Sequence, residues 1–82
     1  MDQPDQRVKM VPVDANQFEA VGFVESTRHL YVKFKNGPVM CLYDVPRFRY
    51  MGMMNSPRKD AYYNTYIKNS FLAKEAQLPR QF

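Results

Sequence analysis

Residues 29–35 alternate strictly, with the apolar side chains Leu30, Val32 and Phe34 at every second position. This period of two is typical of a β-strand that buries one face. The Asn36-Gly37 dipeptide follows, and both of its residues tolerate positive φ, which makes the pair a strong turn signal. The pattern predicts a β-hairpin whose second strand spans residues 39–43.

The length of the turn decides which side chains of the second strand face inward. A two-residue loop directs Val39, Cys41 and Tyr43 inward, whereas a three-residue loop directs Met40 and Leu42 inward and reverses every side chain. Pro38 has no N–H group and therefore disfavours the strict two-residue hairpin. We favour the longer loop.

Further elements flank this hairpin. Residues 18–24 predict a preceding strand that is joined to it by a polar loop at residues 25–28. Asp44-Val45-Pro46 predicts the start of a helix that runs to about Asn55, since proline suits the first turn and aspartate suits the positive N-terminus. Gly52 inside this helix predicts a close packing contact. Ser56-Pro57 separates the first helix from a second at residues 59–70.

The expected fold class is α+β: a three-stranded antiparallel β-meander followed by two helices packed on one sheet face. Residues 1–12 are expected to be a flexible arm or an edge strap, and a short extra N-terminal strand is possible there, although Pro12 limits its pairing. Residues 13–72 form the predicted domain. Residues 73–82 are expected to be a helix end and a loose tail.

The order of these elements resembles the KTSC domain, a small module that occurs at the C-terminus of some lysyl-tRNA synthetases and as a stand-alone bacterial protein. RNA binding is the function suggested for that family. The family reads Tyr-x-Tyr where this chain has Met40-x-Leu42, and aligning the two supports the inward parity of Met40 and Leu42. It reads Ser-Lys-Gly where this chain has Arg58-Lys59-Asp60. The resemblance spans residues 13–71 and is carried by Val21-Gly22-Phe23, by Leu30, Val32 and Phe34, by Gly37, by Asp44-Val45-Pro46, and by Tyr62-Tyr63-Asn64 with Ile67.

Catalysis and tight metal binding are not expected. The chain has one cysteine, Cys41, and one histidine, His29, and their positions are offset along the two hairpin strands. A nucleophile needs a base within reach, and a zinc site needs several Cys or His ligands. We therefore expect a non-enzymatic domain without a cofactor or a metal. The absence of an apolar h-region argues against a secretory signal, and the absence of a run of about 20 apolar residues argues against a membrane span. The single cysteine fits a reducing compartment. We therefore expect a cytoplasmic protein without a membrane association.

The charge is concentrated in the middle of the chain, where residues 28–68 hold eight basic and two acidic residues. Such asymmetry is typical of polyanion binding. On the favoured parity, the sheet face away from the helices carries tyrosines beside lysines, a pattern that stacks bases and neutralises phosphates. The predicted site for RNA or other single-stranded nucleic acid comprises Arg28, Tyr31, Lys33, Lys35, Tyr43, Arg47, Arg49, Arg58 and Lys59.

Three alternatives stay open. In the first, Tyr31 and Tyr43 are sheet stabilisers that pair across strands. In the second, the domain binds a protein partner as an adaptor or inhibitor. The surface used is then the same sheet face, or a surface rich in methionine on the first helix, at Met51, Met53 and Met54. The third alternative is a homodimer formed by edge strands.

Overall fold

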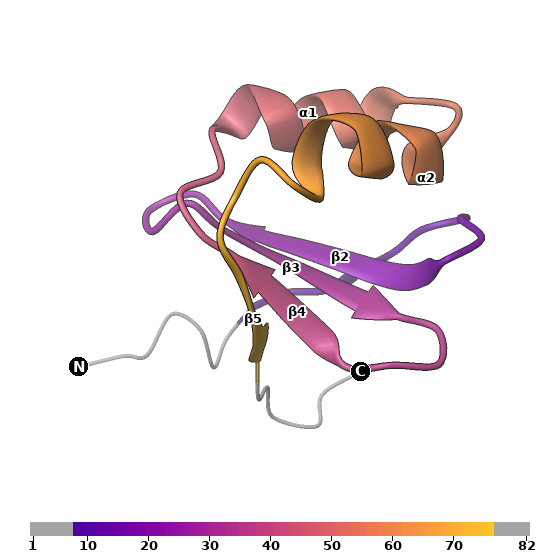
Figure 1. The fold of residues 1–82 in the computed structure, drawn as a ribbon, viewed down its shortest axis with the longest axis horizontal. Helices are drawn as coiled ribbons and strands as arrows, with labels where there is room; N and C mark the ends of the chain where they lie inside the picture. Colours follow the sequence, from indigo (N-terminus) through magenta and orange to yellow (C-terminus); the bar gives the residue numbers. More distant parts are fainter. Residues whose placement is uncertain (1–7, 77–82) are drawn as a thin grey trace.

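Within residues 8–76, five antiparallel strands form a single sheet in chain order, and the helices lie together on one of its faces (Figure 1). The computed structural model describes residues 8–76 of the 82-residue chain. The strands are β1 (Val11–Pro12), β2 (Phe18–Val24), β3 (His29–Phe34), β4 (Val39–Leu42) and β5 (Ala73–Ala76), and the helical segments are α1 (Arg47–Asn55), α2 (Lys59–Tyr62) and the π-helical turn η2 (Tyr63–Ile67).

The β3–β4 turn has the longer loop and gives the predicted parity. Phe34 donates its N–H to the carbonyl of Pro38 at 3.3 Å, so residues 35–37 form the loop. Met40 then lies opposite Val32, and Leu42 lies opposite Leu30. Leu42 is fully buried. The inward position of Met40 and Leu42 is therefore confirmed.

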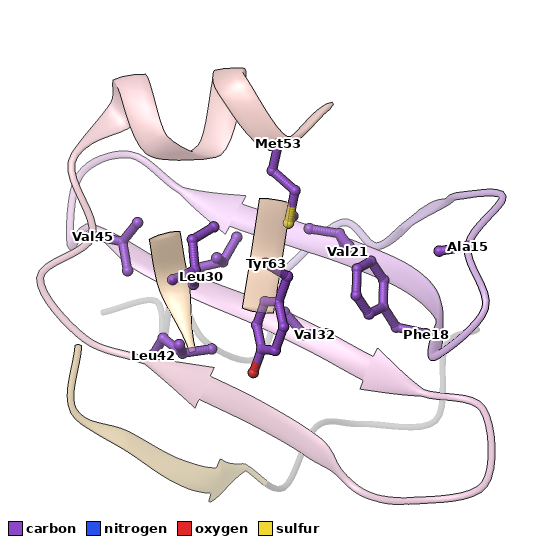
Figure 2. Close-up of a cluster of buried hydrophobic side chains, with 10 residues drawn as sticks. Ala15, Phe18, Val21, Leu30, Val32, Leu42, Val45, Met53 and Tyr63 are labelled. Atoms are coloured by element: carbon purple, nitrogen blue, oxygen red, sulfur yellow. The ribbon is translucent and has the colours of Figure 1, made fainter. Parts of the chain in front are cut away.

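The main core lies between the helices and the sheet (Figure 2). Phe18 sits at one end of it, where its ring contacts Tyr63 edge-on with the centroids 5.6 Å apart. Phe34 is the third ring of this aromatic group, with its centroid 6.1 Å from that of Phe18 and 6.0 Å from that of Tyr63. Edge-to-face pairs of this kind add to the energy of burial. The buried members of the main core are Ala15, Phe18, Val21, Leu30, Val32, Leu42, Val45, Met53, Tyr63 and Ile67.

The sheet has two more strands than the three-stranded meander that was expected. Residues 73–76 do not end a helix, because they pair with β4 as β5, in the register Leu42 to Ala73 and Val39 to Ala76. Their mixed sequence, Ala-Lys-Glu-Ala, carries no apolar alternation and gave no strand signal. At the other edge, β1 pairs Val11 with Val21 and Pro12 with Ala20, as expected for an edge strap. The remaining terminal residues, 1–7 and 77–82, lie outside the described part of the chain.

Both helices begin or end differently from the prediction. Pro46 is the residue before α1 rather than its first helical residue, and no side chain caps the helix. Asp44 adopts φ 60 and pairs with Arg28, so it does not cap α1. The second helix ends at Ile67 rather than Ser70. Its last turn is a π-turn, in which Lys68 donates its N–H to the carbonyl of Tyr63 at 2.8 Å.

The two helices touch at Gly52, as its position in α1 predicted. A Cβ atom at Gly52 would collide with the hydroxyl of Tyr62 and lie 2.7 Å from the Tyr62 ring carbon that bears it. The glycine therefore lets the Tyr62 ring cross α1 at close range, at the usual cost of glycine in a helix.

Candidate nucleic-acid interface

The sheet face predicted to stack bases is covered, and the expectation that Tyr31 is displayed there is wrong. Tyr31 does lie on the face away from the helices, but it is only 1% exposed. It belongs to a second apolar cluster with Val8, Val39 and Cys41, in which Val8 comes from the N-terminal segment. Sequence parity could assign the face of Tyr31, but it gave no sign that residues before β1 cover that face.

The remaining groups of this face also have partners. Lys33 donates to the carbonyl of Phe34 at 3.0 Å and lies 3.3 Å from the carboxylate of Glu19. Tyr43 is half-buried and stacks on His29 with ring centroids 4.9 Å apart. Tyr31 contacts the same imidazole edge-on at 6.2 Å. Both tyrosines therefore pack on His29, which supports the role of sheet stabilisers.

The predicted cationic residues are dispersed over the molecule. Arg28 lies 3.4 Å from Asp44, and the exposed Arg47 lies 3.4 Å from Glu25. Lys35 is exposed in the β3–β4 turn. Exposed ion pairs of this kind contribute about 0–1 kcal/mol each, so their cations can exchange partners at little cost.

Arg58 and Lys59 lie at the turn between α1 and α2, where they line a pocket of about 310 Å³. Asp14 and Asp60 line the same pocket, so its acidic and basic groups balance. The Asp60 carboxylate accepts the backbone N–H groups of Asn16 at 2.6 Å and Gln17 at 2.9 Å, and so fixes the loop before β2. Asp60 thus has a structural role in this chain.

A different surface brings exposed rings and a cation together, on the outer side of the helices. The Arg49 guanidinium carbon lies 5.0 Å from the ring centroid of Phe48 and 4.9 Å from that of Tyr66. The Tyr66 ring packs against Tyr62 at 4.8 Å. Phe48 is 64% exposed and Tyr66 is 45% exposed. We call these four residues, Phe48, Arg49, Tyr62 and Tyr66, the arginine–aromatic cluster.

The sequence prediction included Arg49 but missed the three aromatic members of the cluster, Phe48, Tyr62 and Tyr66. Met53 is the buried residue of α1, with Tyr50 and Met54 packed against the same core. Phe48 and Met51 fall outside that stripe, three residues apart, and both are exposed. An aromatic residue off the apolar stripe was the available signal. The contact between Arg49 and Tyr66 joins two helices and could not be read from spacing.

The described residues offer little else of chemical interest. Within residues 8–76, no group of three or more His, Cys, Asp or Glu side chains is placed to hold a metal ion. Across the same range, no helix is long and apolar enough to cross a membrane.

Tyr63 predicts a pH dependence of stability. Burial raises the pKa of the Tyr63 phenol above its ordinary value of 10.0. Because the unfolded chain then ionises first, the associated stability is complete below pH 10 and is lost as the pH rises through the folded-state pKa. We expect the free energy of unfolding, measured by urea titration, to fall more steeply above pH 10 in the native chain than in Tyr63→Phe. Parallel pH profiles would contradict this expectation.

Comparison with known proteins identifies the family. Residues 15–71 match the model of the KTSC domain, and the chain belongs to this family. Among solved structures, the fold is similar to that of a KTSC domain protein from Yersinia pestis, with a TM-score of 0.82, 20% sequence identity, and coverage of 85% of this chain and 99% of that one. None of the curated proteins matches the chain. The expected family is thus confirmed by the family model. The similarity to the solved structure supports the fold.

Proposed function

We propose that this chain is a non-enzymatic domain that binds single-stranded nucleic acid, RNA in particular, through the arginine–aromatic cluster. The observation that carries the proposal is the position of Arg49 between two exposed rings. Among the residues that the structure describes, no carboxylate pairs with Arg49, whereas Arg28, Lys33 and Arg47 each have one. Its charge is therefore available to an anionic ligand.

The charge of the helical layer supports a polyanion. Residues 46–70 contain five basic residues and a single acidic one, Asp60. Both carboxylate oxygens of Asp60 accept backbone N–H groups, and the side chain faces the loop before β2. Arg47 and Lys68 are both exposed, in α1 and just after η2. A basic surface of this composition attracts phosphates independently of base sequence.

The cluster can serve both parts of a nucleotide. One face of the Phe48 ring is engaged by Arg49, and its high exposure leaves the ring accessible to a base. Stacking of a base on an aromatic ring contributes about 1–3 kcal/mol and tolerates any sequence. The Arg49 guanidinium carbon lies over both rings. The planar fork of N–H donors that an arginine carries suits phosphate oxygens.

A second candidate, binding of a protein partner, is favoured by exposed apolar side chains in the helical layer and just after it. Phe48 and Met51 are exposed on α1, and Leu72, after η2, is 63% exposed. Aromatic residues, methionine and arginine are enriched in protein interfaces. This candidate uses the methionine-bearing helix that the sequence indicated, with Met51 as its exposed methionine.

A salt series separates the two candidates. We expect the affinity for a fluorescent oligouridylate of about ten nucleotides, measured by anisotropy, to fall with salt along a log–log slope of about −2, since about three phosphates are neutralised at roughly 0.7 per phosphate on a single strand. Phe48→Ala should weaken binding with an unchanged slope. Absence of oligonucleotide binding at low salt would reject the nucleic-acid proposal. Recovery of one protein in a pull-down at all salt concentrations, and its loss when Phe48→Ala is used instead, would support the partner candidate.

A further inference from the structure

The second apolar cluster lies on the sheet face away from the helices, where residues 8–10 pack against it. Among residues 8–76, Val8 is its only buried member outside the sheet strands, and Met10 is a partly buried member. We call residues 8–12 the strap. Gly22 on β2 makes room for the strap, because a Cβ there would lie 2.6 Å from Val8 Cγ1, 2.8 Å from Met10 Sδ and 3.0 Å from the carbonyl oxygen of Lys9.

The described attachments of the strap are few. Its strand, β1, pairs with β2 over only two residue pairs. One of these residues is Pro12, which has no N–H group to donate. Val11 is exposed, whereas Val8 is buried and provides the main apolar contact of the strap. Segments with few buried contacts open at a free energy well below that of global unfolding.

The core beneath the helices does not depend on the strap. The main core is built from β2, β3, β4 and the helices together with Ala15 and Val45, and it contains no residue of the strap among its buried members. The cluster beneath the strap contains Tyr31, Val39 and Cys41, whose side chains point to the opposite face. Loss of the strap contacts therefore leaves the helix-side packing in place.

We propose that the strap is a displaceable cover, which opens while the rest of the domain stays folded and thereby controls access to the face that carries Tyr31 and Cys41. This inference is independent of the proposed function, which uses the other side of the molecule. The strap contacts the cluster that contains Tyr31 and Cys41, so its opening would expose these two side chains to solvent.

The Cys41 thiol, which is 4% exposed, reports on opening. We expect a disulfide reagent such as Ellman's reagent to modify Cys41 in the native protein at a rate that changes little at low urea concentrations. The matched comparison is Val32→Cys in a Cys41→Ala background, because Val32 is fully buried beneath the helices. Its thiol should react at least about tenfold more slowly, and only with the denaturant dependence of global unfolding.

Two variants of the strap contact complete the test. Gly22→Ala crowds the strap and Val8→Ala removes its buried side chain, so each should accelerate Cys41 modification several-fold at low urea. In the Val32→Cys background the same changes should alter the rate only as far as they lower global stability. If Cys41 and the Val32→Cys thiol react with the same rate and the same urea dependence, the strap opens only when the domain unfolds, and the proposal is wrong.

Discussion

Arg49→Glu is expected to lower the affinity for single-stranded oligouridylate at low salt by at least about tenfold. The substitution removes a cation that lies about 5 Å from two ring centroids. It also adds a negative charge to a helical layer that has one acidic residue. The remaining rings can still stack bases, but a phosphate that follows the stacked base would meet a carboxylate. Fluorescence anisotropy measures the change, and circular dichroism shows whether the fold is retained.

Two matched variants locate the effect. Lys35→Glu makes the same charge change at an exposed position in the β3–β4 turn, and we expect a loss of less than about threefold, from the change of net charge alone. Arg49→Lys keeps the charge but removes the planar group between the rings, and an intermediate loss is expected. If Lys35→Glu weakens binding as much as Arg49→Glu, the ligand does not use the arginine–aromatic cluster.

Phe18→Ala is expected to produce the largest loss of stability. Phe18 is fully buried and its ring contacts both Phe34 and Tyr63. Truncation of a buried phenylalanine costs about 3–5 kcal/mol, through lost burial and the cavity that remains. A small domain has about 5–15 kcal/mol of stability in total, so the loss should lower Tm by more than about 10 °C.

The matched control for this substitution is Phe48→Ala, which removes the same side chain from an exposed position. Phe48 is 64% exposed, and its replacement should change the free energy of unfolding by no more than about 0.5 kcal/mol. Thermal and urea unfolding followed by circular dichroism compare the two variants. Equal destabilisation by both substitutions would mean that the ring of Phe18 is not packed in the main core.

The hairpin alternation and Pro38 together predicted the inward side chains of β3 and β4, because a period of two admits only two parities and the loop length selects one. The C-terminal edge strand, β5, escaped prediction for a physical reason. The side chains of β5 alternate neither in polarity nor in size, and its place in the sheet comes from backbone pairing with β4. Backbone pairing between distant segments has no local sequence signal.

The candidate site was predicted less well than the fold. Parity correctly assigned Tyr31 to the face away from the helices, but it could not show the tertiary contact with Val8 that contributes to the burial of that face. Gly22 was the sequence signal for that contact, because a glycine inside a strand can indicate a close backbone approach. On the helices, Phe48 and Tyr66 form part of a candidate site because both contact Arg49. The contact with Tyr66 arises only when the two helices pack together.

Chemical-shift mapping with ¹⁵N-labelled protein and oligouridylate tests the central claim most directly. The account predicts that the largest amide shifts occur in α1 at residues 47–51 and in the second helical segment at residues 62–68, with little change at Tyr31 and Lys33. Shifts concentrated on Tyr31, Lys33 and Tyr43, with the helical residues unmoved, would contradict it.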